Sequence, residues 1–270
     1  MDPDIPPPVT TLPADAPRLS RPQRAAAAIK DWVVERGMRP GDRLPAEAEL
    51  MEHFSMAKGT IREALRVLEA QGLIRTRTGP GGGAFVNEVS EARARALLGN
   101  YFYFNEISIG DIYELRRVLE PALVSQLAGQ LDAGQLAQLE NVMMAYERPA
   151  KTIEEAERQR HAELDFHALL AEFSPNPLMR FQVRFLISLL KDLTVCRRIY
   201  RREIPGLRRS GRDYQSRLLL ALRAGDEKSA RAIMRAHMHT AQAIMEQQEV
   251  VVLRQFLSDA ESPPGGRTPE

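Results

Sequence analysis

The sequence of 270 residues contains one cysteine, one tryptophan and no long uninterrupted run of apolar residues. The lone cysteine, Cys196, excludes a disulfide within the chain and favours the reducing cytoplasm, with a reactive thiol as the alternative role of this side chain. A membrane-spanning helix needs about 18 consecutive apolar residues, a length that no segment approaches. We therefore expect a cytoplasmic protein with no membrane partner.

An excess of charge of either sign is also missing. The chain has 37 Lys and Arg residues against 36 Asp and Glu residues, which gives a formal net charge of +1. This balance neither indicates nor excludes a nucleic-acid partner, because acidic residues elsewhere can offset a local basic patch. The case for DNA binding must therefore rest on a motif.

The length of the chain suits two domains, each large enough for its own core. Residues 1–19 are acidic and proline-rich and lack the basic start and apolar run of a secretory signal, so we expect a disordered leader. We expect a first domain at 20–88, an all-helical second domain at 89–256 and a disordered tail at 257–270.

In the first domain, the spacing of apolar residues predicts helices at 20–36, 46–54 and 57–72, with a Pro-Gly segment at 38–45 suited to an edge strand. The third helix has an apolar stripe and a separate basic and polar face. That face carries Lys58, Thr60, Arg62 and Arg66. Two short helices joined by a tight turn, the second with such a face, are typical of a helix that enters the major groove of DNA.

A β-hairpin is predicted directly after these helices. Residues 73–78 (LIRTRT) alternate between apolar and polar, GPGGG supplies a turn, and AFV returns. A glycine-rich tip at Gly82 lets backbone amides approach phosphates, and Arg75 and Arg77 add positive charge. The pattern predicts a winged helix-turn-helix that binds double-stranded DNA; a surface helical hairpin beside a solvated ribbon is the alternative.

The string LPAEAELMEHFSMAKGTIREALRVLEAQGLI, followed by the glycine-rich turn and AFV, resembles the winged-helix signature of the GntR family. In that family the recognition helix usually starts Ser-Arg-x-Thr-Val-Arg, which implies DNA contacts from Lys58, Thr60 and Arg62 here. Ala57 lacks the serine hydroxyl that would cap the helix, and Ala48 stands where members often carry a further DNA-contacting arginine. Lys58 keeps the charge but not the two-pronged guanine contact of an arginine.

The second domain shows only helical periodicity and no convincing strand. Seven helices are predicted, at 91–104, 109–129, 133–148, 152–174, 177–201, 210–224 and 227–256. The expected fold class is therefore mainly α, with a winged helix-turn-helix and its small β-hairpin followed by an all-α antiparallel helical bundle.

Polar residues interrupt the apolar faces of several of these helices. In the helix at 109–129, Arg116 lies within the expected buried stripe of Ile112, Leu115, Leu119 and Leu123. A buried guanidinium needs an anionic partner, which an effector could supply. A surface pair between Arg116 and Glu120 is the alternative.

Three further helices contribute inward polar residues. Glu163 and His167 are four residues apart on one face, where they can share a metal ion or a hydrogen bond. His237 lies on the apolar stripe of the last helix, and Gln215 holds a similar position in the helix before it. Satisfied core histidines are the alternative interpretation of His167 and His237.

The stretches DIYELRRVLEPALVSQLA, ELDFHALLAEFSPNPLM and LLLALRAGDEKSARAIMRAHM resemble the FadR-type C-terminal ligand domain found in one branch of these regulators. Many such domains hold a divalent metal, zinc or nickel, through one aspartate and three histidines. The resemblance implies Glu163, His167 and His237 as ligands, with Gln215 in place of the fourth, and Arg116 as the pocket arginine. Gln215 offers only a neutral oxygen or a direct hydrogen bond to the effector.

These observations predict a homodimeric, ligand-responsive transcriptional regulator that binds a palindromic operator and responds to a small organic acid. The resemblance implies a repressor, because repression is the commoner outcome in the family. One alternative is a regulator whose helical domain only dimerises and binds no ligand. An enzyme with a catalytic metal at the same residues lacks a recognisable nucleophile or phosphate loop. The arginine-rich stretch RRIYRREIPGLRRSGR predicts either a site for an anionic ligand or a solvated face.

Overall fold

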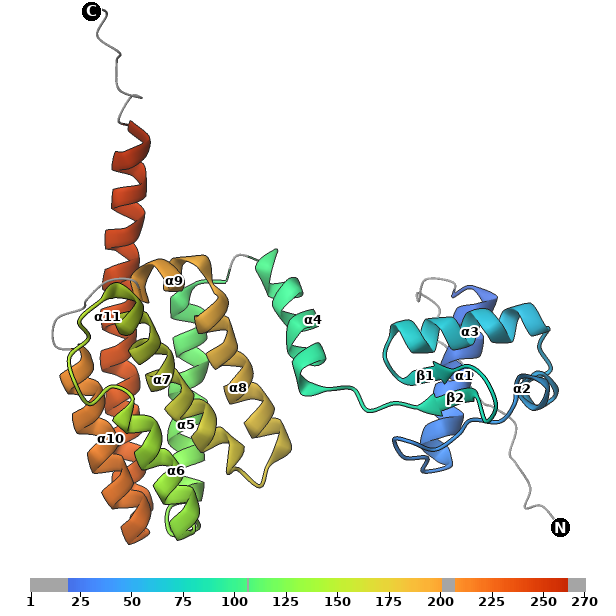
Figure 1. Ribbon diagram of the computed structural model, residues 1–270, viewed down its shortest axis with the longest axis horizontal. Helices are drawn as coiled ribbons and strands as arrows, with labels where there is room; N and C mark the ends of the chain where they lie inside the picture. The colour runs from blue at the N-terminus through green and yellow to red at the C-terminus, as the bar shows by residue number, and fades with distance from the viewer. Residues whose placement is uncertain (1–18, 106, 201–206, 262–270) are drawn as a thin grey trace, which may run out of the picture. The chain divides into compact units, whose positions relative to one another are not determined.

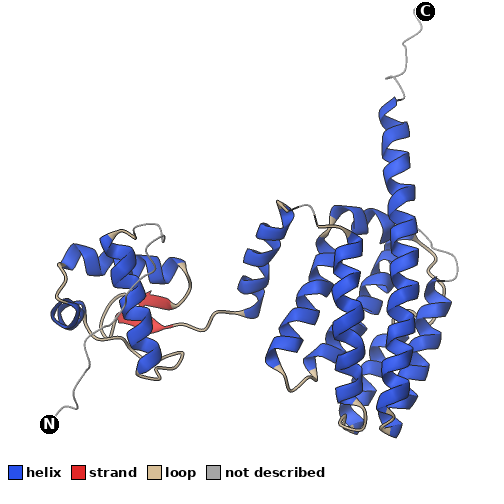
Figure 2. Ribbon diagram, turned by 180° about the vertical axis from the view of Figure 1, so that it is seen from behind, coloured by secondary structure: helices blue, strands red, loops and turns tan. Residues whose placement is uncertain are grey.

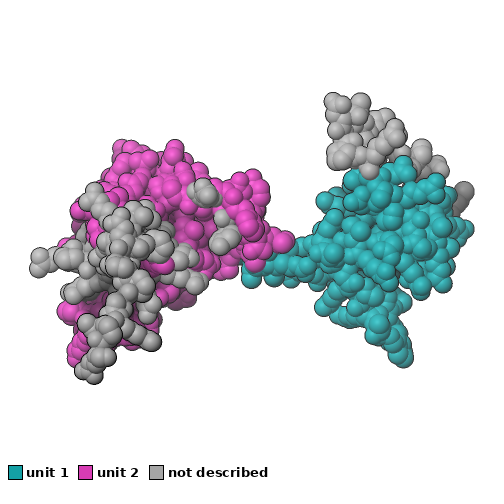
Figure 3. Space-filling view, turned by 90° about the horizontal axis from the view of Figure 1, so that it is seen from above, with its two compact units in different colours: residues 1–94 teal, residues 95–270 magenta. Residues whose placement is uncertain are grey.

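The computed structural model describes residues 19–105, 107–200 and 207–261 and divides the chain into two compact units, with the division between Ala94 and Arg95 (Figure 3). Each unit has a separate cluster of buried apolar side chains. Nearly all of the leader and most of the tail expected from the sequence lie outside the described residues. In the described part of the chain, no helix combines the length and the apolar character that crossing a membrane requires.

The first unit contains the three helices that the sequence predicts, α1 (Arg21–Glu35), α2 (Glu47–Phe54) and α3 (Lys58–Ala70) (Figure 1). At the start of α1 the Ser20 hydroxyl accepts the backbone N–H of Gln23, whose side chain accepts the Ser20 N–H in return. α1 and α2 both pack against α3. This confirms the helix-turn-helix.

The predicted hairpin is also present, as strands β1 (Ile74–Arg77) and β2 (Gly83–Val86), drawn in red in Figure 2. The strands are antiparallel, and their register runs from the Ile74↔Val86 pair to the Arg77↔Gly83 pair. The edge strand expected at 38–45 is reduced to one isolated bridge, Arg43↔Phe85.

The core of the first unit joins all of these elements. The buried apolar side chains are Ala25, Ala26, Ile29, Leu44, Leu50, Ile61, Ala64, Leu68, Ile74, Ala84 and Val86. Trp32, the only tryptophan of the chain, lies at the edge of this core on α1. The Arg36 guanidinium lies 5.0 Å from the Trp32 ring centroid, and the His53 ring lies 5.8 Å from it.

Helices make up the rest of the described chain. Their bounds are α4 (Glu91–Tyr103), α5 (Ile109–Leu127), α6 (Ala133–Met144), α7 (Ile153–Glu172), α8 (Pro177–Asp192), α9 (Thr194–Tyr200), α10 (Leu207–Ala224) and α11 (Glu227–Glu261). The single helix expected at 177–201 is wrong, because Leu193 adopts an extended conformation (φ −58°, ψ 127°) that separates α8 from α9. The last helix extends to Glu261 rather than ending at residue 256.

Consecutive long helices from α5 to α8, and again α10 and α11, run in alternating directions (Figure 1), which confirms the antiparallel bundle. α5 packs against both α11 and α8, so it lies at the centre. Its buried stripe differs from the expected one. Leu115 is 52% exposed, while Tyr113 and Val124 are buried in its place.

Cys196 is buried on α9. Burial raises the pKa of the Cys196 thiol to about 12, so the thiol is protonated at neutral pH. Burial and the raised pKa both disfavour the alternative role of a reactive thiolate. The arginine-rich stretch at 197–212 lies partly outside the described residues.

Candidate DNA interface and effector site

The recognition helix α3 has one buried face and one exposed face. Ile61, Ala64 and Leu68 are buried in the core, as the three-to-four-residue spacing predicts. Of the four residues expected to contact DNA, three are exposed and one is half-buried. The exposed residues are Lys58, Arg62 and Arg66, and the half-buried one is Thr60.

Arg62 is held by a carboxylate from the neighbouring helix. Its Nε donates to both carboxylate oxygens of Glu47 on α2, at 3.1 and 2.9 Å. The two side chains are 56% and 38% exposed. Because these bonds use only Nε, the terminal Nη1 and Nη2 groups of Arg62 make no hydrogen bond to any of the described residues.

Arg66 is paired in a different way. Its terminal Nη1 donates to Glu63 Oε1, three residues earlier on the same helix, at 2.6 Å. One N–H of this end of Arg66 is therefore occupied in the absence of DNA.

The hairpin is fixed to α3 through Thr76. The Thr76 N–H donates to Glu69 Oε1 at 2.8 Å, and its hydroxyl donates to Glu69 Oε2 at 3.2 Å. Because side chains alternate along a strand, Arg75 and Arg77 leave the opposite face of the hairpin. Arg77 lies there with its guanidinium 4.8 Å from the Phe85 ring centroid.

The tip of the wing is fixed by Arg43, which the sequence analysis did not single out. Arg43 Nη2 donates to the Gly82 carbonyl oxygen at 2.6 Å. A Cβ atom at Gly82 would lie 2.5 Å from the Arg77 carbonyl oxygen and 2.8 Å from that of Gly79, so only glycine fits here. A hollow between α3, the wing and the segment before α2 is lined by Arg43, Glu47, Arg62, Arg66 and Thr76, among others.

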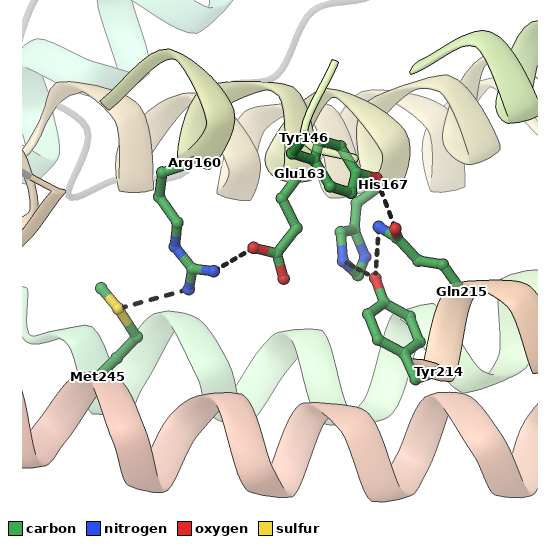
Figure 4. Close-up of polar contacts among 7 residues, drawn as sticks. All are labelled: Tyr146, Arg160, Glu163, His167, Tyr214, Gln215 and Met245. Atoms are coloured by element: carbon green, nitrogen blue, oxygen red, sulfur yellow. Dashed lines mark hydrogen bonds and ion pairs between the residues drawn. The ribbon is translucent and has the colours of Figure 1, made fainter. Parts of the chain in front are cut away.

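The second unit contains a chain of buried hydrogen bonds that runs between helices (Figure 4). The Tyr146 hydroxyl, just after α6, donates to Gln215 Oε1 at 2.5 Å. Gln215 Nε2 donates to the Tyr214 hydroxyl oxygen at 3.2 Å. The Tyr214 hydroxyl is hydrogen-bonded to His167 Nε2 at 2.7 Å.

The series of hydrogen bonds continues from His167 on α7 to Glu120 and Arg116 on α5. His167 Nδ1 donates to Glu120 Oε2, since a carboxylate only accepts. The other oxygen, Glu120 Oε1, accepts from Arg116 Nε at 2.5 Å. Arg116 and Glu120 are each 1% exposed. The two side chains therefore form the pair that the sequence analysis gave as the alternative, but the pair is buried and not at the surface.

The charges of this network stabilise each other. Burial alone would raise the pKa of Glu120, but Arg116 and His167 outweigh that effect and lower it to about 2. His237 on α11 stacks on the Tyr214 ring with a centroid separation of 3.3 Å. Burial, together with the charges on His167, Arg116 and Arg160, lowers the pKa of His237 well below its usual value, so this imidazole is neutral.

A second buried guanidinium lies two turns before His167 on α7. Arg160 Nη1 is paired with Glu163 Oε2, and Arg160 Nη2 lies 3.8 Å from the Met245 sulfur (Figure 4). Two buried donors of these arginines have no hydrogen-bond acceptor among the described residues. They are Arg116 Nη2 and Arg160 Nε.

Comparisons with known proteins assign a known family description to each of the two units. The family description "Bacterial regulatory proteins, gntR family" matches residues 22–86, and "FCD domain" matches residues 111–240. The chain is 26% identical over 213 residues to the HTH-type transcriptional regulator LutR of Bacillus subtilis (strain 168), covering 77% of this chain and 93% of LutR. It is 25% identical over 157 residues to the Uxu operon transcriptional regulator of Escherichia coli (strain K12), covering 58% of this chain and 60% of that protein.

The chain belongs to the gntR family. Among solved structures, Streptococcus agalactiae GntR matches with a TM-score of 0.56 and 22% identity, covering 82% of this chain and 99% of that one, which shows a shared fold. As a gntR-family protein with an FCD domain, the chain is a DNA-binding transcriptional regulator. The matched families and relatives are regulators and not enzymes, which removes the metalloenzyme alternative.

The residues that the family resemblance assigns to a metal do not fit a zinc or nickel ion. Both ring nitrogens of His167 are engaged, with Glu120 and with Tyr214. Glu163 is paired with Arg160, and Gln215 is held from both ends by tyrosine hydroxyls. No group of three His, Cys, Asp or Glu side chains in the described part of the chain is arranged to hold a metal. The expected set of Glu163, His167 and His237 therefore does not present converging free donors.

All five inward polar residues of the sequence analysis are buried, namely Arg116, Glu163, His167, Gln215 and His237. Sequence reasoning missed their partners Tyr146, Arg160 and Tyr214. Tyr146 falls within the helix expected at 133–148, but that helix ends at Met144, so the helical period does not give the direction of the Tyr146 side chain. Arg160 is three residues before Glu163, the spacing of a helical ion pair, and this signal was available.

Proposed function

We propose that this chain represses transcription as a homodimer on a palindromic operator and that a small organic acid, bound in the second unit without a divalent metal, controls it. The observation that carries the effector proposal is Arg116. This guanidinium is 1% exposed, and its Nη2 group has no acceptor among the described residues. A buried unsatisfied donor is costly, and a carboxylate is the acceptor that satisfies a guanidinium best.

The surroundings of Arg116 support a small polar ligand. Tyr214, Gln215, His167 and His237 offer hydroxyl, amide and imidazole groups on adjoining helices. These groups can exchange their present hydrogen-bond partners for the oxygen atoms of an organic acid, which replaces the role of a metal in orienting the ligand. Gln215 thereby takes the direct hydrogen-bonding role that the sequence left open.

The dimer proposal rests on symmetry and on uncovered apolar side chains. A twofold-symmetric dimer places two recognition helices on two half-sites, which a palindromic operator supplies. On the outer face of α5, Leu115 is 52% and Val118 is 66% exposed. Apolar residues in such a position are suited to contact with a second copy. The bacterial cytoplasm, where the operator lies, is the proposed location.

The test begins with DNA from beside the gene that encodes this chain, in line with control of an adjacent operon. Full-length protein is titrated against labelled fragments, and a panel of small organic acids is then screened for release of the fragment. We expect at least one acid to release DNA and to stabilise the protein, by about 2.7 kcal/mol at a concentration 100 times its Kd. Sedimentation equilibrium should give a dimer.

The control variant is Arg116→Met combined with Glu120→Gln, which removes both charges of the buried pair together. It should bind the operator normally and ignore the acid. Release of DNA by the acid at its usual concentration in this variant would remove Arg116 from the site. If no acid in the panel changes stability or DNA binding, the domain that only dimerises becomes the better description.

A further inference from the structure

The edge of Arg62 that is left free is the one that recognises guanine. An arginine makes its two-pronged contact to guanine O6 and N7 with two N–H groups of the guanidinium plane. Glu47 occupies only Nε, at 3.1 and 2.9 Å, and thereby fixes the plane while Nη1 and Nη2 stay available. Arg62 is thus held in an orientation suited to a base contact before DNA arrives.

Glu47 itself is a suitable partner for the other half of the same base pair. In the major groove a G·C pair presents two acceptors on guanine and one amino donor, N4, on cytosine. A carboxylate only accepts and has about four lone-pair positions, so Glu47 can bind Arg62 Nε and a cytosine amino group at once. The Arg62–Glu47 pair therefore offers donors and acceptors in the pattern of one complete G·C edge.

The other basic residues of the recognition helix are less suited to this role. Arg66 has its terminal Nη1 bound to Glu63 at 2.6 Å, so its Nη1–Nη2 edge, the one that is free in Arg62, is partly occupied. Lys58 is a point charge without a planar pair of donors. Ala48 has no polar side chain at all. Among these residues, Arg62 is the arginine whose Nη1–Nη2 edge makes no hydrogen bond to the described residues.

We propose that the Arg62–Glu47 pair recognises one G·C base pair of the DNA site, with Arg62 on the guanine and Glu47 on the cytosine amino group. Glu47, a residue of α2, is then a determinant of operator sequence. This proposal requires DNA binding alone and is independent of the effector and of the dimer.

The test uses the full-length protein and a pool of DNA duplexes with a randomised central segment. Repeated selection and sequencing give the preferred duplex, and Kd is then measured for that duplex and for versions with each base pair replaced in turn. We expect Arg62→Ala to lower the discrimination at one G·C pair by tenfold or more, and Glu47→Ala to lower it at the same pair by about tenfold. Discrimination elsewhere should stay as in the unmodified protein.

Glu63→Ala is the matched control, since it removes an exposed carboxylate that also pairs with an arginine of α3. It should leave the discrimination at the base pair that Arg62→Ala relaxes unchanged. The dependence of Kd on salt should have the same slope in Glu47→Ala as in the unmodified protein, because Glu47 neutralises no phosphate. Circular dichroism and the unfolding temperature verify that each variant is folded.

Three outcomes would overturn the proposal. Glu47→Ala could leave discrimination intact at all positions, or relax a base pair other than the one that Arg62→Ala relaxes. It could also tighten binding to every duplex by the same factor, which would mean that Glu47 only repels the DNA backbone. A preferred duplex without a sensitive G·C pair would contradict the assignment of Arg62 as well.

Discussion

At the scale of single residues, Glu120 is the carboxylate that links Arg116 to His167 in the buried polar network. One of its oxygens accepts from Arg116 Nε, and the other accepts from His167 Nδ1. Replacing it with glutamine leaves a buried guanidinium without a countercharge. We expect Glu120→Gln to lower the free energy of unfolding by about 3–5 kcal/mol, measured by urea denaturation.

Glu140→Gln is the control for this prediction. Glu140 also pairs with an arginine, Arg223, at 2.7 Å, but both side chains are about half exposed. Loss of such a surface pair should cost about 0–1 kcal/mol. Equal losses in the two variants would show that burial does not decide the strength of the Glu120 pair.

Metal content is the second prediction at this scale. Protein purified without a histidine tag should contain no stoichiometric zinc or nickel by elemental analysis, and it should take up neither at micromolar concentration. Gln215→His should not restore uptake, because His167 and Glu163 remain bound to their present partners. A tight one-to-one metal in either protein would refute this account of the site.

The sequence predicted which polar residues point inward but only one of their partners. Arg116, His167 and His237 were found because they interrupt apolar stripes with a helical period. The pair of Arg116 with Glu120 lies within one helix and was among the alternatives, whereas the contacts of His167 with Glu120 and Tyr214 join different helices, and a one-dimensional pattern does not say which helices lie side by side. The contact of Tyr214 with the His167 nitrogen that a metal would need is of this kind.

At the scale of elements, the recognition helix lacks a side-chain cap at its start. Ala57 is the N-cap of α3, with φ −65° and ψ 150°, and makes no capping hydrogen bond. A serine hydroxyl in this conformation accepts a free N–H of the first turn. Ala57→Ser should therefore stabilise the first unit by about 0.5–1 kcal/mol, read from its thermal unfolding.

Ser108→Ala is the reverse experiment in the second unit. Ser108 caps α5 by accepting the Asp111 N–H at 3.1 Å. Its loss should destabilise by about 1 kcal/mol. If Ala57→Ser stabilised nothing while Ser108→Ala destabilised as expected, the start of α3 would have to be satisfied in another way.

The ends of the helices show which boundaries the sequence was sufficient to predict. Glycines end several helices as expected, and Gly129 and Gly225 adopt positive φ angles of 72° and 71°. The break at Leu193 was missed because the local sequence, KDLTVC, has neither glycine nor proline. An interruption without a breaker residue is imposed by packing and leaves no local signal.

At the scale of the whole molecule, the two separate cores predict two separable unfolding events. Leu68 of the first core and Leu190 of the second are 2% and 0% exposed. Each substitution by alanine should cost about 2–5 kcal/mol and move one calorimetric transition only. A single transition that shifts with either variant would mean that the units unfold together.

Trp32 gives this molecule an intrinsic fluorescent probe of one of its two units. It is the only indole in the chain and belongs to the unit that contains the recognition helix. Its ring is bordered by Arg36 and His53, so its emission depends on the packing of α1 against α2. Excitation near the red edge of protein absorbance therefore gives fluorescence from the DNA-binding unit alone. The second unit, which contains the tyrosines, does not contribute to this emission, and no dye or engineered probe is needed.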